Sequence, residues 1–166
     1  EVVGRDAGKM LNRISANEVD GEAGLITYTQ WLNTDGKLEA DLTVTKMSDE
    51  KYLVVVTDTM HRHVETHMKK NILTDENVFV HDVTGGISQL NVQGPKSREL
   101  MQKLTGTDLS NEAFPFRAAK EISIGYSKLW LIRITYVGEL GYELYIPTEQ
   151  AVQVYDEIVE AGKEFN

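Results

Sequence analysis

The sequence predicts an α+β fold made of two related halves, each running strand–helix–strands–helix. Stretches in which apolar and polar residues alternate, as in β-strands, are interspersed with stretches of helical spacing. Gly4 and Gly94 lie 90 residues apart, and each follows a valine by one or two residues and precedes a predicted helix. Tyr52 and Tyr142, also 90 residues apart, each begin an apolar strand that leads into a polar helix cap. Because both features share one offset, we interpret the chain as a duplicated unit.

The two halves are expected at about residues 1–75 and 76–166, within one domain. A chain of 166 residues can bury a substantial core. It begins at Glu1 rather than Met, with the strand-like Val2 and Val3 already in progress, and it shows no signal-peptide or transit pattern. We therefore interpret it as a piece of a longer polypeptide. The alternative is that the chain was trimmed.

The first half should begin with a strand and a helix, followed by three strands and a second helix. Asp6 can cap the first helix, whose apolar residues fall on one face. The three strands are expected at residues 25–32, 38–45 and 51–57. A glycine-containing turn at 33–36 joins the first two strands as a hairpin. Asp58 or Thr59 then caps a helix that continues to Ile72.

The second half repeats this order. Pro95, after Gly94, is tolerated in the first turn of a helix. Thr148 caps the last helix, and Gly162 is placed to end it. Strands are expected at residues 78–83, 88–92, 121–124 and 129–136, and a further strand leads out through Glu143.

The composition excludes several classes of protein and site. A formal net charge of −9 without a basic cluster argues against a nucleic-acid-binding surface, because phosphate binding requires clustered Lys and Arg. The absence of cysteine excludes disulfides, thiolate catalysis and cysteine-based metal sites, and it is compatible with a reducing compartment. The longest aliphatic run, 53–56, is far shorter than the roughly 20 residues of a membrane span. We expect a soluble protein without nucleic-acid or membrane partners, in the cytoplasm or, in a eukaryote, the mitochondrial matrix.

The stretch 133–145 is the strongest candidate for a binding site. Eight of its residues, 136–143, include two glycines, two carboxylates and two tyrosines, a density that no hydrophobic core needs. Gly138 and Gly141 permit positive φ angles and allow a main chain to approach a ligand closely. In the outgoing strand, side chains alternate between faces, so Glu143 and the tyrosine two residues later share one face, and the intervening residues form an apolar face.

In the first half, the segment 28–44 contains a second group of candidates. Asp is depleted in strand interiors, so Asp41 requires a reason, and the residue 90 positions later is Leu131. Asp41 is either a binding-site residue or a solvated residue of an edge strand. Tyr28 and Trp31 are either ligand contacts or core aromatics.

Other patterns point to weaker candidates. His61, His63 and His67 favour a solvated helix face over a metal site, because no third ligand follows at suitable spacing. The segment 138–141 has the spacing of an RNA-clamping GxxG loop, against which the acidic charge argues. The sequence lacks a phosphate-binding glycine loop, a nucleophile elbow and a flavin or nicotinamide fingerprint. We expect no metal, and a flavin or nicotinamide would bind elsewhere.

Three motifs resemble those of the folate-binding aminomethyltransferase family, the T-proteins of glycine cleavage, along nearly the whole chain. They read Tyr28-x4-Asn33-x-Asp35-Gly36-x4-Asp41-Leu42-x-Val44, Gln93-Gly94-Pro95-Lys96 and Tyr136-x-Gly138-Glu139-x-Gly141-Tyr142-Glu143. Residues 136–145, with Phe114-Pro115-Phe116 upstream, are most similar to the C-terminal region of sarcosine and dimethylglycine dehydrogenases. The resemblance implies ferredoxin-like halves that form a T-protein-type folate-binding domain. It also implies that FAD binds only in a domain of the same polypeptide outside this chain.

The resemblance carries roles to four matched positions. Glu143 matches the family residue that accepts two hydrogen bonds from the pterin edge of tetrahydrofolate. Tyr28 and Tyr136 would pack on the pterin. Asp41 would be catalytic, lying near folate N5 and N10, where it polarises or deprotonates a nitrogen and stabilises an iminium-like cation. The implied reaction transfers a one-carbon unit from an oxidised N-methylglycine to tetrahydrofolate, forming 5,10-methylenetetrahydrofolate.

Other functions of the same fold stay open. The chain could belong to a glycine-cleavage aminomethyltransferase or a folate-dependent demethylase, and the amine donor is not specified by the sequence. A non-catalytic regulatory module is a further alternative, against which the joint presence of Tyr28, Asp41 and Glu143 argues. A folate-dependent repair protein is disfavoured because that branch typically carries a cysteine-containing loop, and this chain has no cysteine.

Overall fold

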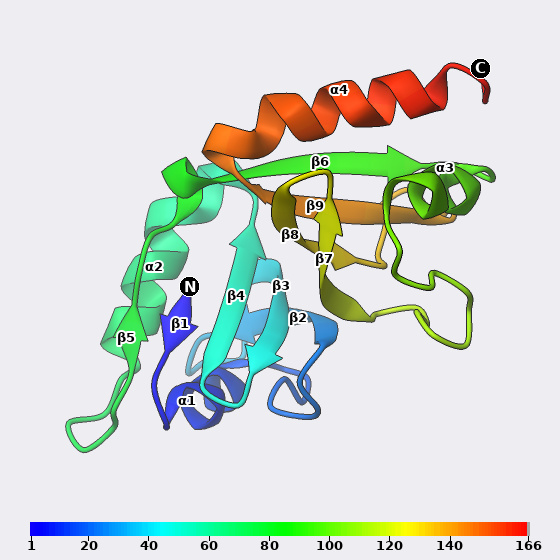
Figure 1. Ribbon diagram of the computed structural model, residues 1–166. Helices are drawn as coiled ribbons and strands as arrows, with labels where there is room; N and C mark the ends of the chain where they lie inside the picture. The colour runs from blue at the N-terminus through cyan, green and yellow to red at the C-terminus, as the bar shows by residue number, and fades with distance from the viewer. Residues whose placement is uncertain (166) are drawn as a thin grey trace. The chain divides into compact units, whose positions relative to one another are not determined.

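The computed structural model describes residues 1–165, and the chain divides into two compact units, Glu1–Asp82 and Val83–Asn166 (Figure 1). The short strand β5 (Phe79–Val80) pairs with β1 (Val2–Val3) and therefore belongs to the first unit. The division falls after this strand, whereas the expected boundary near residue 75 precedes it. No helix in the part of the chain that the structure describes is long and apolar enough to cross a membrane.

The first unit is a five-stranded antiparallel sheet in the order β2-β3-β4-β1-β5. Its further elements are α1 (Ala7–Ile14), β2 (Leu25–Leu32), β3 (Leu38–Ser48), β4 (Lys51–Val56), the 3-10 turn η1 (Asp58–Met60) and α2 (His61–Lys70). The second helix thus ends two residues before Ile72, where the sequence pattern placed its end.

Alternation along the strands decides which side chains of the first unit reach its core. Trp31 of β2 and Leu42 of β3 are buried in one cluster with Met10 of α1 and Met68 of α2, so both helices cover the same face of the sheet. The indole Nε1 of Trp31 donates a hydrogen bond to Ser15 Oγ at 2.9 Å. Trp31 is therefore a core aromatic, and its sequence neighbours Gln30 and Leu32 occupy the opposite face.

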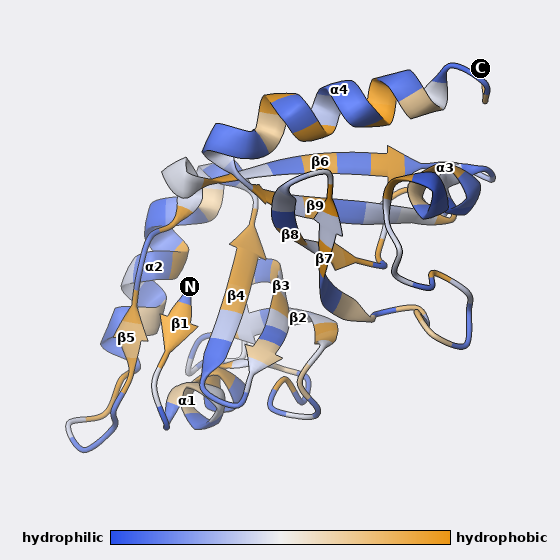
Figure 2. Cartoon of the chain, viewed as in Figure 1, coloured by the Kyte–Doolittle hydropathy of each residue, from blue (hydrophilic) through white to orange (hydrophobic). Residues whose placement is uncertain are grey.

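The second unit is a four-stranded antiparallel sheet in the order β6-β9-β8-β7. Its elements are the 3-10 turn η2 (Thr84–Gly86), β6 (Ile87–Gln93), α3 (Ser97–Leu104), β7 (Ala119–Ile124), β8 (Ser127–Ile132), β9 (Gly141–Pro147), the 3-10 turn η3 (Thr148–Gln150) and α4 (Ala151–Gly162). Met101 of α3 and Val154 of α4 share one core with Leu131 and Leu144 of the sheet. Hydrophobic and hydrophilic residues alternate along α4, as expected of a helix that packs with one side (Figure 2).

The structure confirms the predicted duplication. α1 and α3, η1 and η3, and α2 and α4 begin 90 residues apart, and Val2 pairs with Tyr52 as Val92 pairs with Tyr142. The strand orders β2-β3-β4-β1 and β7-β8-β9-β6 are also equivalent. The first unit is a ferredoxin-like arrangement with one additional edge strand, β2, and the second unit carries the equivalent edge strand, β7. Within the described residues, the second unit has no counterpart of β5.

Two predicted strands end several residues earlier in the structure, and the strand predicted at 51–57 ends one residue earlier, at Val56. The strand predicted at 129–136 ends at Ile132, where its pairing with β9 stops opposite Glu143, and residues 133–140 form a loop. Arg133 still donates its backbone N–H to Ala118 O at 2.8 Å, which extends the pairing by one step. The strand predicted at 78–83 is only Phe79–Val80.

The residue equivalent to Asp41 is Lys128, and the prediction that it is Leu131 was wrong. Leu131 pairs with Leu144 as Val44 pairs with Val54, so Leu131 corresponds to Val44. The β7–β8 turn consists of only two residues, which shortens the offset on this strand from 90 to 87 residues. A fixed offset therefore misaligns strands that are separated by turns of unequal length.

Candidate functional site

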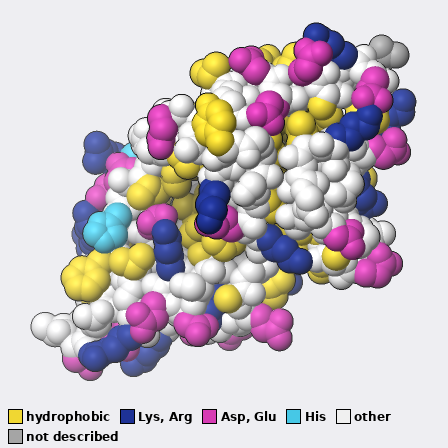
Figure 3. Space-filling view, viewed as in Figure 1, with side chains coloured by type: hydrophobic (Ala, Val, Ile, Leu, Met, Phe, Trp, Pro, Cys, Tyr) yellow, Lys and Arg dark blue, Asp and Glu magenta, His cyan; other side chains and the backbone are white. Residues whose placement is uncertain are grey.

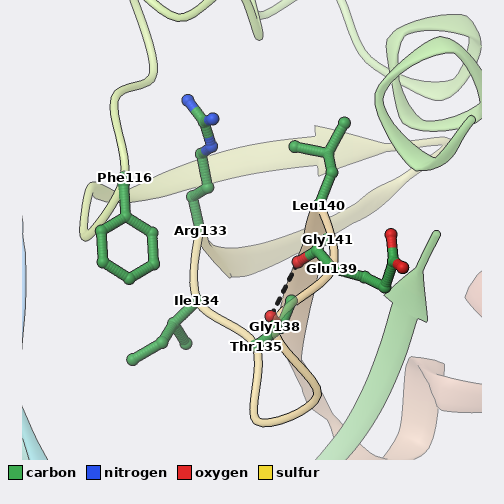
Figure 4. A pocket seen from close by; sticks show the side chains of 8 residues that line it. All are labelled: Phe116, Arg133, Ile134, Thr135, Gly138, Glu139, Leu140 and Gly141. Atoms are coloured by element: carbon green, nitrogen blue, oxygen red, sulfur yellow. Dashed lines mark hydrogen bonds between the residues drawn. The ribbon is translucent and has the colours of Figure 1, made fainter. Parts of the chain in front are cut away.

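The stretch that the sequence singled out forms a loop beside a cleft in the second unit. The cleft measures about 440 Å³ and is lined by Phe116, by residues 133–135 and by residues 138–141 (Figure 4). The guanidinium of Arg133 donates a hydrogen bond from Nη1 to the carbonyl oxygen of Phe114 at 2.8 Å, which ties the start of the loop to the segment before β7. The loop is thus held at a defined position on the sheet.

Glycine is required at positions 138 and 141 for two different structural reasons. Gly138 has a φ of +77°, which favours glycine because a Cβ would strain the backbone. Gly141 is not among the residues with positive φ; a Cβ there would lie 2.7 Å from Thr135 Cγ2 and 2.9 Å from Val92 O. The expectation of positive φ therefore holds for Gly138, whereas Gly141 permits close packing of β9, β6 and the loop.

The alternation predicted for β9 is confirmed. Tyr142, Leu144 and Ile146 are fully buried in the core of the second unit. Glu143 and Tyr145 point to the opposite face of the sheet. Glu143 is half-buried, and Tyr145 is buried. A carboxylate and a phenol thus share one face of the strand.

A chain of hydrogen bonds fixes the carboxylate of Glu143. The hydroxyl of Tyr145 donates to Glu143 Oε2 at 2.6 Å, and Gln89 Nε2 donates to the Tyr145 hydroxyl at 3.3 Å. Burial raises the pKa of Tyr145 well above its usual range, and the negative charge of Glu143 and the hydrogen bond to it raise this pKa further. Tyr145 therefore stays a neutral donor. In the described part of the chain, Glu143 Oε1 accepts no hydrogen bond.

In the first unit, the structure brings Tyr28 and Asp41 onto one exposed sheet face. Asp41 lies opposite Gln30 and accepts a hydrogen bond from Gln30 Nε2 at 3.1 Å. Tyr28 lies opposite Thr43 and is 57% exposed, so it is not a core aromatic. Asp41 lies on β3, which is an inner strand, because β2 forms the edge of the sheet. The alternative that placed Asp41 on an edge strand is therefore wrong. Asp41 is nevertheless exposed.

Tyr136 lies on the loop between β8 and β9 and is fully exposed. Among the described residues, neither Tyr136 nor Glu143 lines the cleft beside this loop. Within the second unit, the predicted site residues therefore occupy two places, the tip of the loop and the polar face of β9.

His63 and His67 of α2 form a stack with Trp31. His63 Nε2 lies 2.7 Å from Glu39 Oε2, and the ring of His63 stacks on His67, which in turn stacks on Trp31. Burial lowers the pKa of His67. In the part of the chain that the structure describes, no group of three or more His, Cys, Asp or Glu residues is placed to hold a metal ion. On the face shown in Figure 3, Lys and Arg are scattered among Asp and Glu.

Sequence reasoning missed two polar residues of the site, Gln89 and Gln30. Gln30 lies directly opposite the predicted site residue Asp41, and Gln89 lies directly opposite Tyr145, which bonds to Glu143. Only the pairing register reveals these neighbours, because nothing in the local pattern distinguishes either glutamine from a solvated strand residue.

The model of the family described as GCVT N-terminal domain matches residues 1–166. The aminomethyltransferase of Thermoanaerobacter pseudethanolicus is 36% identical over 165 residues, which cover 99% of this chain and 44% of the relative. The mitochondrial dimethylglycine dehydrogenase of Homo sapiens is 31% identical over 164 residues, which cover 98% of this chain and 19% of the relative. The chain thus spans less than half the length of these curated relatives.

Solved structures share the fold. The crystal structure of the glycine cleavage system aminomethyltransferase T from Bartonella henselae superposes with a TM-score of 0.78 at 20% identity, covering 95% of this chain and 42% of that one. At this identity, the likeness establishes the fold alone.

Proposed function

The chain belongs to the family of GCVT N-terminal domains, and from this premise we propose that it binds tetrahydrofolate and supports one-carbon transfer to it. The observation that carries the proposal is the carboxylate of Glu143, which stands on the polar face of β9 with Oε2 anchored and Oε1 without a hydrogen bond among the described residues. It ends the motif that begins at Tyr136, on which the resemblance to folate-binding aminomethyltransferases rests.

The residues present fit a pterin. A pterin edge offers an N–H and an amino group side by side, and an ionised carboxylate accepts such a pair as two charge-assisted hydrogen bonds. Each carboxylate oxygen has two lone pairs, so Oε2 of Glu143 can accept a second hydrogen bond beside that of Tyr145. Tyr28 and Tyr136 are both exposed and offer flat apolar rings for stacking.

Asp41 is the proposed catalytic residue. When bound, tetrahydrofolate supplies the nitrogen that takes up the one-carbon unit, and 5,10-methylenetetrahydrofolate is the proposed product. The exposed carboxylate of Asp41 can accept a proton from such a nitrogen and can stabilise a nearby iminium-type cation. Gln30 holds this carboxylate through a single hydrogen bond of 3.1 Å to Oδ1, which leaves Oδ2 for this work.

The supply of the oxidised amine is proposed from the same family. The human relative is a dimethylglycine dehydrogenase of which this chain covers 19%. We propose a comparable arrangement, in which an FAD-binding domain of the same polypeptide oxidises an N-methylated amine and this domain receives the one-carbon unit. Exclusion of water by this domain would suppress the competing hydrolysis of the iminium to formaldehyde.

The proposal is tested by calorimetric titration of 5-formyltetrahydrofolate into the protein and into Glu143→Gln. Glutamine replaces one acceptor oxygen with a donor that opposes the donors of the pterin. Breaking a buried charge-assisted pair costs on the order of 2 to 5 kcal/mol, so affinity should fall roughly 30-fold or more. Leu144→Ile is the matched control, because Leu144 lies on the opposite face and is fully buried. Equal affinities of wild type and Glu143→Gln would refute the folate site.

Asp41→Asn tests the catalytic part separately. The substitution keeps size and most hydrogen bonding but removes the charge, so folate affinity should stay near wild type while methylene transfer falls and free formaldehyde rises. The measurement is the ratio of methylenetetrahydrofolate to formaldehyde formed by the complete enzyme. An unchanged ratio would show that Asp41 takes no part in the transfer.

A further inference from the structure

Tyr145 and Glu143 form a bonded pair on one face of β9. Two residues of a strand that are two positions apart share a face, and here the phenol reaches back to the carboxylate, with 2.6 Å between the hydroxyl oxygen and Glu143 Oε2. This is the short distance typical of an O–H donor to an ionised acceptor. Tyr145 is 6% exposed, whereas Glu143 is only half-buried. The anchor is thus fixed in the protein while the carboxylate reaches the surface.

The partners of the hydroxyl determine its direction. A phenol has one proton and can accept hydrogen bonds through its lone pairs. Gln89 Nε2 occupies the acceptor side at 3.3 Å, so the proton of Tyr145 is directed to Glu143. With Oε2 held in this way, the plane of the carboxylate is set and Oε1 is the oxygen that faces a ligand.

We propose that Tyr145 is a positioning residue that orients Glu143 and thereby determines selectivity for ligands that present two adjacent N–H donors. The inference rests on the proposed folate function and deepens it, because it assigns part of the recognition to a residue that does not touch the ligand. An unanchored glutamate samples several rotamers and loses affinity through the entropy of ordering. An anchored one discriminates between a ligand with both donors and a ligand with one.

Tyr142 is a matched control on the same strand. Its hydroxyl is buried on the opposite face and has no hydrogen-bond partner among the described residues. Tyr142→Phe therefore removes the same atom from the same strand without touching Glu143. Any general effect of deleting a buried phenol hydroxyl from β9 is measured by this variant.

The test is a double-mutant cycle read by folate affinity. Tyr145→Phe, Glu143→Gln and the double variant are titrated with 5-formyltetrahydrofolate and with an analogue in which a methyl group replaces the pterin 2-amino group. Tyr145→Phe should weaken binding of the complete ligand about tenfold, the effect of losing a hydrogen bond to a charged group. It should weaken the methyl analogue clearly less. In the Glu143→Gln background, it should change affinity less than about twofold, since the carboxylate it orients is gone.

The outcomes separate this inference from the proposed function. Equal losses for both ligands and in both backgrounds, matched by Tyr142→Phe, would overturn the positioning role while leaving the folate site intact. Wild-type affinity of Glu143→Gln would instead refute the proposed function, and the inference would fall with it. Melting temperatures of all variants confirm that each affinity is that of folded protein.

Discussion

The two units share their topology, but they carry polar side chains at different strand positions. On the hairpin, Asp41 and Gln30 of the first unit correspond to Lys128 and Ser123 of the second. Lys128 forms a surface ion pair at 3.5 Å with Glu121, an arrangement typical of a solvated sheet face. The first unit thus presents its carboxylate without a cationic side chain opposite it in the register.

On the strands β4 and β9, it is the second unit that carries the polar residues. Glu143 and Tyr145 of β9 correspond to Leu53 and Val55 of β4, at the same offset of 90 residues. Since both strands occupy the same place in the same sheet order, the fold does not demand a carboxylate at this position. Residues that both units share at equivalent positions maintain the fold. Glu143 is not one of them, because only the second unit has a carboxylate at this position.

The largest expected effect in this comparison concerns the two equivalent glycines before α1 and α3. Gly4 and Gly94 have φ angles of +128° and +126°, so alanine is strained at both, at a cost of about 1 to 3 kcal/mol. A Cβ at Gly4 would also lie 2.2 Å from the carbonyl oxygen of Asn77, whereas nothing lies within 4 Å of one at Gly94. Gly4→Ala should therefore destabilise the protein by about 1 to 3 kcal/mol more than Gly94→Ala. Urea unfolding of both variants measures the difference, and equal losses would contradict the two local structures.

The tyrosines Tyr52 and Tyr142 offer a second equivalent pair with a smaller expected difference. The hydroxyl of Tyr52 donates to Asp20 Oδ1, which also accepts from Lys46 Nζ at 2.8 Å, while the hydroxyl of Tyr142 is buried without a partner among the described residues. Tyr52→Phe should destabilise by about 1.5 to 3 kcal/mol, as expected for a hydrogen bond to a charged group. Tyr142→Phe should be neutral or stabilising. Thermal unfolding compares the two, and a larger loss for Tyr142→Phe would show that its hydroxyl has a partner.

The smallest effect is expected on the outer faces of the equivalent helices α2 and α4. Arg62, Glu65 and Lys69 form ion pairs on α2, and the residues 90 positions later, Val152, Tyr155 and Val159, are exposed on α4. Because none of these three α4 residues is in the core, Val152→Lys should change stability by less than about 0.5 kcal/mol. Calorimetric melting of this variant checks the expectation. A drop of several degrees would mean that the exposed valine is packed in solution.

Periodicity predicted the elements well where one face of a strand or helix is buried. The first hairpin strand, Leu25–Leu32, agrees residue for residue, because its apolar alternation and the turn after it are both encoded locally. The strand predicted to reach residue 136 has the same alternation, but its pairing with β9 ends at Ile132 and its backbone hydrogen bonds on the other side end at Arg133. The local pattern does not contain that information. Tertiary pairing decided its end.

The site shows the same division. The sequence placed Glu143 and Tyr145 on one face, which follows from alternation alone, and the structure adds that they bond to each other and to Gln89. The equivalence of Asp41 and Lys128 required the register of two hairpins with unequal turns. The face that each side chain of a strand occupies can therefore be predicted from its residues, whereas contacts across strands depend on turn lengths elsewhere in the chain.

The central claim, that the polar face of β9 holds the pterin of a folate, is tested most directly by a nuclear magnetic resonance titration. Tetrahydrofolate is added to the isotopically labelled chain of 18.7 kDa, and backbone amide shifts are followed to saturation. We predict saturable shifts at residues 141–145 of β9 and at Gln89 and Asn91, which lie opposite Tyr145 and Glu143 on β6. Saturable shifts confined to the cleft residues Phe116 and Arg133, or no shifts at all, would contradict the account.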